Sequence, residues 1–269
     1  MIIFIALLGL LLAICLNSLA DHLPPDELDV RHRPTLPQCR YCGARHAPLY
    51  WLALTGFLFQ GGHCEHCHAP RRARHVLVEL GLALALAYAW NWAGGAPEKF
   101  LPAAVILSLF MLITVIDIEH RLILYNVAVV SALSIGVMNS LLPERGLFKT
   151  LVGGLVGYGF WFVIFGAGQI FSMLVARWRG QPLDEIAFGG GDVNLGGIVG
   201  LAVGWSGILF TLPLTIFSAA AFSLVYLGVQ AVRGKASLFM VIPYGPFIIL
   251  GALTIYFYGQ EFAAWYLRR

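Results

Sequence analysis

Two aspartates stand at the ends of long apolar runs, where charged side chains are rare. Asp117 lies near the end of the run 101–118, and Asp192 lies at the start of the run 191–204. A carboxylate at the centre of a bilayer costs about 2.5–3.5 kcal/mol on insertion scales, so it usually has a function. Two neighbouring carboxylates do not readily ionise together, so one keeps a proton while the other acts as a base. Such a pair can activate water and protonate a leaving amine without a covalent intermediate.

A structural role stays open for each aspartate taken alone. Asp117 could be a charge at the membrane interface, and Asp192 could be the cap of a helix N-terminus. Three glycines, Gly189, Gly190 and Gly191, precede Asp192 and let the backbone pass close to a helix or an extended substrate. The two aspartates also share one depth in the topology derived below. We therefore predict that they are catalytic and that the three glycines support the site.

Other residues near the apolar runs receive structural interpretations. We expect Glu79 and Glu119 to lie at the membrane interface, where His120 could pair with a carboxylate. Small residues recur at helical spacing, which lets helices approach closely in lipid. They are Gly153 and Gly157 in one run, and Gly196, Gly200 and Gly204 in another. This pattern predicts helix packing rather than a cofactor loop.

Four of the five cysteines form two C-x-x-C pairs separated by 21 residues. Each pair can present two thiolates from one tight turn, and two such turns complete a tetrahedral site for zinc. The ligands predicted in this way are Cys39, Cys42, Cys64 and Cys67. Two alternatives are two disulfides, which require an oxidising compartment, and a site in which a nearby histidine replaces one thiolate. A fully coordinated zinc leaves no position for water, so we expect a structural role. Cys15 is expected to be a packed apolar residue.

The composition is that of a membrane protein. Of 269 residues, 59% are hydrophobic and only 12% are charged. The sequence predicts an all-α polytopic membrane protein with about eight transmembrane helices. The predicted spans are 1–20, 76–93, 101–118, 122–142, 150–175, 191–204, 207–232 and 241–265. The first lacks a preceding Lys or Arg and is longer than a usual signal core, which favours a span over a cleaved signal.

The polar region 21–75 and the basic residues set the domain organisation and the orientation. We expect a first transmembrane helix at 1–20, a zinc-binding loop domain at 21–75 and a transmembrane bundle at 76–269. If the loop is cytoplasmic, twelve Lys and Arg residues face the cytosol and five face outward. This agrees with the positive-inside rule and places both termini outside. The net charge of +3 is small, so no nucleic-acid partner is expected.

With these motifs in place, the chain resembles the bacterial type IV prepilin peptidases, which belong to the GxGD class of intramembrane aspartyl proteases. The resemblance covers nearly the whole chain. It includes Asn17 in the first span, the cysteine pairs with their 21-residue interval, and the segment 74–79. Asp117 looks like the first catalytic aspartate, and Gly189-Gly190-Gly191-Asp192 fits the Gly-x-Gly-Asp motif of the second. The segment 242–246 matches the start of the family's last helix.

The resemblance also implies an activity and a location. The substrates would be pilins and pseudopilins of type IV pilus or type II secretion systems, cut at the cytoplasmic face of the bacterial inner membrane. Cleavage would fall between a short basic leader and the hydrophobic helix that follows it. Many members also methylate the new N-terminus with S-adenosylmethionine, and no G-x-G-x-x-G motif indicates this independently.

The sequence departs from the family pattern beside both aspartates. The family usually has Pro and then Asp or Asn at the positions of Leu124 and Tyr125, and Lys at that of Asn194. These changes affect the expected substrate preference more than the reaction class. Two other functions stay open: an ion-coupled transporter, and a catalytically silent adaptor of a pilus or secretion assembly. A transporter predicts acids at the midplane and inverted repeats, whereas both aspartates lie near the cytoplasmic boundary.

Overall fold

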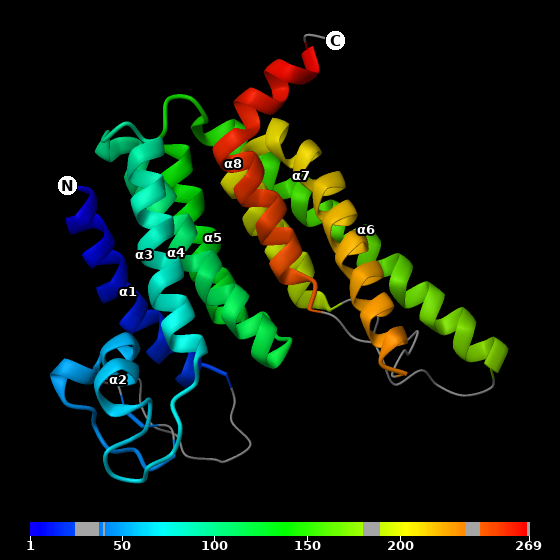
Figure 1. Cartoon of the computed structure of the whole chain (residues 1–269). Coiled ribbons are helices and arrows are strands. Elements are labelled where there is room, and N and C mark those ends of the chain that lie inside the picture. Colours follow the sequence, from blue (N-terminus) through cyan, green and yellow to red (C-terminus); the bar gives the residue numbers. More distant parts are fainter. Residues whose placement is uncertain (25–37, 40, 180–188, 235–242, 268–269) are drawn as a thin grey trace. The chain divides into compact units, whose positions relative to one another are not determined.

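The fold is all-helical, as the composition predicts. A computed structural model describes residues 1–24, 38–39, 41–179, 189–234 and 243–267 (Figure 1). Within these ranges the only β-type pairings are two isolated bridges, Gln38–Arg45 and His63–Pro70. The chain divides into two compact units, Met1–Ile116 and Asp117–Arg269. The domain boundaries predicted from the sequence remain predictions.

The first unit packs two helices against each other and carries the cysteine loop at one end. Its elements are α1 (Ile2–His22), the short 3-10 helix η1 (Pro48–Tyr50), α2 (Ala53–Gln60), α3 (Arg74–Trp92) and most of α4 (Pro97–His120). A methyl group at Gly9 of α1 would lie 2.7 Å from the Cα atom of Ala83 in α3, so the two backbones are nearly in contact. Close to the loop, the Asp21 carboxylate of α1 accepts hydrogen bonds from Arg74 and, at 2.8 Å, from His75.

The second unit is built on the contact between α6 and α7. Its helices are α5 (Tyr125–Ser140), α6 (Gly146–Arg179), α7 (Gly190–Val232) and α8 (Gly245–Leu267). A methyl group at Gly153 would lie 2.5 Å from the carbonyl oxygen of Gly200, and one at Gly157 would clash with the carbonyl oxygen of Gly196. The two sets of small residues that the sequence spaces four apart therefore pack on each other. This confirms the prediction of helix packing.

Helix α7 consists of two segments that meet at Gly204. Gly204 has φ 75° and ψ 176°, which is not helical. Figure 1 shows the two segments running in different directions. The break lies where the sequence separates the spans 191–204 and 207–232. A positive φ is accessible to glycine without the steric penalty that a side chain would bring.

Asn139 of α5 compensates for the backbone groups that this break leaves without helical partners. Its side-chain amide donates hydrogen bonds to the carbonyls of Leu201, at 2.9 Å, and Ala202, at 2.8 Å. Carbonyls in the last turn of a helix have no partner within the helix, and an unpaired carbonyl is costly when buried. Asn139 is itself fully buried. It therefore stabilises the end of the α7 segment that begins at the candidate active site.

Each predicted span coincides with a helix or with one segment of α7. By length and composition, four of the described helices could cross a membrane: Ile2–His22, Pro97–His120, Gly146–Trp178 and Gly190–Val232. Large apolar side chains such as Leu155 and Phe217 are more than 70% exposed, as expected for surfaces that face lipid. The membrane fold is thus confirmed, while the count of eight spans remains a prediction.

Candidate functional site

Asp117 lies three residues before the end of α4 and is almost completely buried. Only 5% of the residue is exposed. Its Oδ2 atom accepts a hydrogen bond of 3.1 Å from the backbone N–H of Gly245, the first residue of α8. The end of α4 is fixed by a backbone hydrogen bond, in which the Arg121 N–H donates to the Asp117 carbonyl at 2.8 Å. Arg121 itself adopts a positive φ of 53°. The carboxylate on α4 is therefore oriented by a backbone group of α8, which is distant in sequence.

Asp192 lies in the first turn of α7 and is partly exposed. Its Oδ2 atom accepts a hydrogen bond of 3.3 Å from the Gly189 N–H, and its own N–H donates to the Gly189 carbonyl at 3.2 Å. These contacts cap the helix N-terminus, which is the structural role that the sequence left open. Capping uses one carboxylate oxygen and leaves the other for chemistry.

Several contacts place the two aspartates in one site. The charges of Asp117 and Asp192 interact electrostatically. A methyl group at Gly191 would lie 2.9 Å from Cβ of Ile123, in the segment that follows α4. One at Gly245 would lie 3.5 Å from Leu195, a single turn beyond Asp192. The start of α7, the end of α4 and the start of α8 therefore converge on the pair.

The three glycines before Asp192 differ in their surroundings. A methyl group at Gly190 would meet no atom of the described residues within 4 Å, whereas one at Gly191 would press on Ile123. Gly189 is extended, with φ −83° and ψ 147°, and its N–H donates a hydrogen bond to the Asp192 carboxylate. Close backbone approach is thus required at Gly191 and not at Gly190.

Sequence reasoning gave no role to the residues that begin α8. Tyr244 interacts electrostatically with Asp192, and its ring packs edge-on against Trp161 at a centroid distance of 5.5 Å. Gly245 supplies the hydrogen bond to Asp117. The sequence does contain a signal at this place, the segment Pro243-Tyr244-Gly245-Pro246. Its glycine stands at the start of a helix and allows the backbone to approach a neighbouring side chain closely. We add both residues to the candidate site.

Gly245→Ala should displace the Asp117 carboxylate without unfolding the protein. The added methyl would lie 2.6 Å from Oδ2 and 3.1 Å from Cγ of Asp117. A misplacement of about 1 Å in a catalytic group can cost about 100-fold in rate. We therefore expect kcat of the cleavage reaction proposed below to fall by at least about tenfold. Gly190→Ala is the matched control and should leave kcat unchanged; equal losses in both variants would contradict this account of Gly245.

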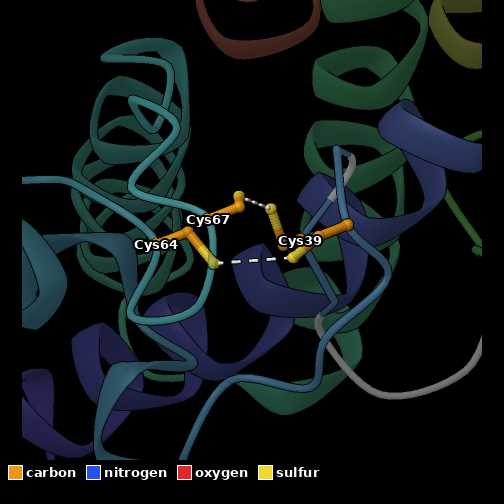
Figure 2. A group of neighbouring side chains, drawn as sticks. Cys39, Cys64 and Cys67 are labelled. Atoms are coloured by element: carbon orange, nitrogen blue, oxygen red, sulfur yellow. Dashed lines mark hydrogen bonds between the residues drawn. The ribbon is translucent and has the colours of Figure 1, made fainter.

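The four cysteines of the two C-x-x-C pairs come together in the first unit. Their Sγ atoms all lie within 4.8 Å of one another, so they could hold a metal ion. Figure 2 shows Cys39, Cys64 and Cys67 coming from two loop segments and pointing toward one another. The Sγ–Sγ distance is 3.6 Å between Cys39 and Cys67 and 3.8 Å between Cys42 and Cys64. Four thiolates at about 2.3 Å from a tetrahedral zinc would be about 3.8 Å apart.

The local electrostatics of the cluster favour the thiolate form of Cys64 and the thiol form of Cys39. Burial acts to raise the pKa of Cys64, but hydrogen bonds from the amides of Cys67 and His66 bring it down to about 7. Burial raises the pKa of Cys39 to about 12, against the effect of the Cys42 and Tyr41 amides. A bound cation would favour deprotonation of the remaining thiols, because metal binding releases protons from its ligands.

Glu79 has a structural role that the sequence did not indicate, and it is only 1% exposed. Its carboxylate accepts hydrogen bonds from the Ala53 N–H at 2.6 Å and the Leu54 N–H at 2.9 Å, so it caps the start of α2 and ties the loop to α3. Cys15 is exposed on α1 rather than packed. His120 does lie near a carboxylate, with its Nε2 atom 3.9 Å from Glu119.

These features define a class of protein: an all-helical membrane protein with two interacting aspartates at helix ends and a four-cysteine cluster in a polar loop. Residues 7–92 match the model of the bacterial peptidase A24 N-terminal domain, and residues 104–224 match that of the type IV leader peptidase family. The chain belongs to the type IV leader peptidase family.

Several curated proteins are similar in sequence to most of this chain. A protein of Dichelobacter nodosus named prepilin leader peptidase/N-methyltransferase is 27% identical over 227 residues, covering 83% of this chain and 71% of its own length. A Legionella pneumophila protein of the same name is 25% identical and covers 85% of this chain and 74% of its own length. One from Burkholderia pseudomallei strain 1026b is 25% identical, with coverage of 88% and 72%. No solved structure matches the chain.

Proposed function

We propose that this protein is a prepilin peptidase, which removes the short basic leader of pilin or pseudopilin precursors by a two-aspartate mechanism. The observation that carries the proposal is the convergence of Asp117 and Asp192, whose charges interact at the meeting point of three helix ends. Membership of a peptidase family and the names of the curated relatives support it. The location that follows is the bacterial inner membrane, with the cysteine loop in the cytosol and both termini outside.

In the proposed mechanism, one acid acts as a general base and the other as a general acid. Each carboxylate has its Oδ2 atom oriented by a backbone N–H, from Gly245 for Asp117 and from Gly189 for Asp192. The ionised acid takes a proton from water, which attacks the scissile carbonyl. The protonated acid donates its proton to the leaving amine, so the products are a leader with a free carboxylate and a mature chain with a free amine. No covalent bond to the protein forms.

The experiment that tests this function maps the cut. Purified protein in phospholipid liposomes is incubated with several pilin precursors, and the products are identified by mass spectrometry. We expect one cut per precursor, between the basic leader and the hydrophobic helix. Intact precursors after incubation with folded, zinc-loaded protein would favour the silent adaptor, and proton or ion flux through protein-containing liposomes would favour the transporter.

We further propose that the four-cysteine cluster binds a structural zinc ion. The Cys39→Ser/Cys42→Ser double variant should lose about one equivalent of zinc per chain, because two thiolates cannot complete a tetrahedral site. The loop 39–67 should then become sensitive to protease, since metal binding and folding of such a loop are linked. Metal content by mass spectrometry and limited proteolysis measure both effects. Cys15→Ser is the control, and unchanged zinc content in the double variant would refute the zinc site.

Methylation of the new N-terminus with S-adenosylmethionine is a second candidate activity. The names of the curated relatives support it, because they include N-methyltransferase. The cavity of the first unit, which is lined in part by Asn17, Tyr41 and Trp51, has a volume of about 60 Å³. Small-molecule sites usually occupy about 300–1,000 Å³, so the donor does not fit this cavity as it stands. We assign no residues to the donor; transfer of a labelled methyl group to cleaved pilin tests the activity.

A further inference from the structure

A groove with a volume of about 380 Å³ lies among α5, α6 and the first segment of α7. All three helices belong to the second unit. On α7, the lining residues are Asn194, Gly197, Ile198 and Leu201, a face with the spacing i, i+3, i+4, i+7. That face extends over about 10 Å of helix, or two turns. It begins two residues after Asp192, so this end of the groove lies within one turn of Asp192 along α7, on another face of the helix.

The other two walls show the same helical spacing. Helix α5 contributes Tyr125, Ala128, Val129 and Ala132, and α6 contributes Leu151, Gly154, Leu155 and Tyr158. Three helices thus each present one two-turn face to a common hollow. Such a hollow has the shape of a missing fourth helix, and helices bind grooves of this kind through residues at the same spacing. Small residues in its walls allow a helix backbone to approach closely.

The groove is polar at one end and apolar at the other. Asn194 and Tyr125 lie at the first positions of the α7 and α5 faces, and Tyr158 lies at the last position of the α6 face, which runs antiparallel to the other two. The opposite end is formed by Leu201, Ala132 and Leu151. The polar end is therefore the end next to Asp192. A ligand that fits is a helix that is apolar along its length and polar where it reaches the aspartates.

We propose that this groove binds the hydrophobic helix of the substrate, the segment that directly follows the scissile bond. The inference rests on the proposed function, which supplies a substrate with an apolar helix beside the cut. In this arrangement an extended polar segment passes over the first turn of α7 to reach the aspartates, and the first two turns of the helix lie against α5, α6 and α7. Tyr125 and Asn194, two positions where the sequence departs from the family pattern, lie at the mouth of the groove and are specificity-determining residues in this arrangement.

Photo-cross-linking tests the occupant of the groove without relying on catalysis. Benzoylphenylalanine is placed at Val129, which lines the groove, or at Val130, which is 56% exposed and does not line it. Both proteins carry Asp192→Asn and are illuminated in liposomes with an intact pilin precursor. We expect cross-linking to the precursor helix at 129 to exceed that at 130 by at least about fivefold, since a bound helix would contact only the groove position. Cross-links at 129 that reach only lipid, or only a second copy of this chain, would overturn the proposal.

Cleavage kinetics give an independent readout. Val129→Trp should fill the groove and raise KM for the full precursor by about tenfold, which corresponds to the loss of about 1.4 kcal/mol of binding. It should leave cleavage of a short peptide, cut before the helix begins, unchanged. Val130→Trp should affect neither substrate. Equal slowing of both substrates by Val129→Trp would show a structural defect and overturn the proposal. Failure of wild type to cut any precursor would instead refute the proposed function.

Discussion

Asp117→Asn and Asp192→Asn should each reduce the rate of precursor cleavage by at least about 1,000-fold while the protein stays folded, because removal of a general acid or base typically costs about 10²–10⁴-fold. An asparagine side chain can still accept the backbone hydrogen bonds from Gly245 and Gly189 that the aspartates accept. It cannot take or give a proton at neutral pH. Single-turnover cleavage in liposomes measures the loss of the chemical step directly.

The control for this prediction lies on the same helix. Glu119→Gln removes a carboxylate two residues from Asp117, next to His120 at 3.9 Å, and outside the proposed pair. Its cleavage rate should stay within about threefold of wild type, because glutamine keeps the size of this partly buried side chain and a long ion pair with a partly exposed histidine contributes little. If Glu119→Gln lost as much activity as Asp117→Asn, the assignment of the first acid would be wrong.

Gly153→Ala should be strongly destabilising, because Gly153 packs against the backbone of α7. The added methyl would lie 2.5 Å from the carbonyl oxygen of Gly200 and 2.7 Å from Cα of Gly204. These atoms are backbone, so the two helices must move apart rather than rotate a side chain. Overpacking of this kind costs about 1–3 kcal/mol. A thermal melt in detergent should show the midpoint lowered by roughly 2–12 °C, given about 2–4 °C per kcal/mol for a unit of this size.

Gly159→Ala on the same helix provides the matched comparison. Apart from the backbone of its own helix, no atom in the described part of the chain lies within 4 Å of the methyl that this change would add. Alanine is a better helix former than glycine by about 1 kcal/mol, so the variant should be as stable as wild type or more stable. A melting midpoint for Gly153→Ala at or above that of Gly159→Ala would contradict the close packing of α6 on α7.

The residues that carry chemistry could be predicted because their type and spacing are local. Two C-x-x-C pairs imply facing turns whatever the rest of the fold does, and the four Sγ atoms do lie within 4.8 Å of one another. Asp117 and Asp192 were visible because an acid at the end of an apolar run is costly. The break at Gly204 was visible because a glycine stands between two apolar runs.

The supporting contacts could not be predicted because their partners are far apart in sequence. Gly245 donates to Asp117 across 128 positions, and Asn139 reaches the Leu201 carbonyl across 62. Glu79 was expected at the membrane interface, and the sequence named no partner for it. Its actual partners, the Ala53 and Leu54 amides, lie in a separate short helix that the sequence did not reveal. Such pairings depend on which helices meet, and a single sequence does not state this.

The central claim is that Asp117 and Asp192 together hydrolyse a pilin precursor. Its most direct test compares wild type with the Asp117→Asn/Asp192→Asn double variant, both purified, folded and loaded with zinc, on the same precursor in liposomes. The account predicts a shortened pilin and a free leader from wild type, and only intact precursor from the double variant. A shortened pilin in equal yield from both proteins would contradict it.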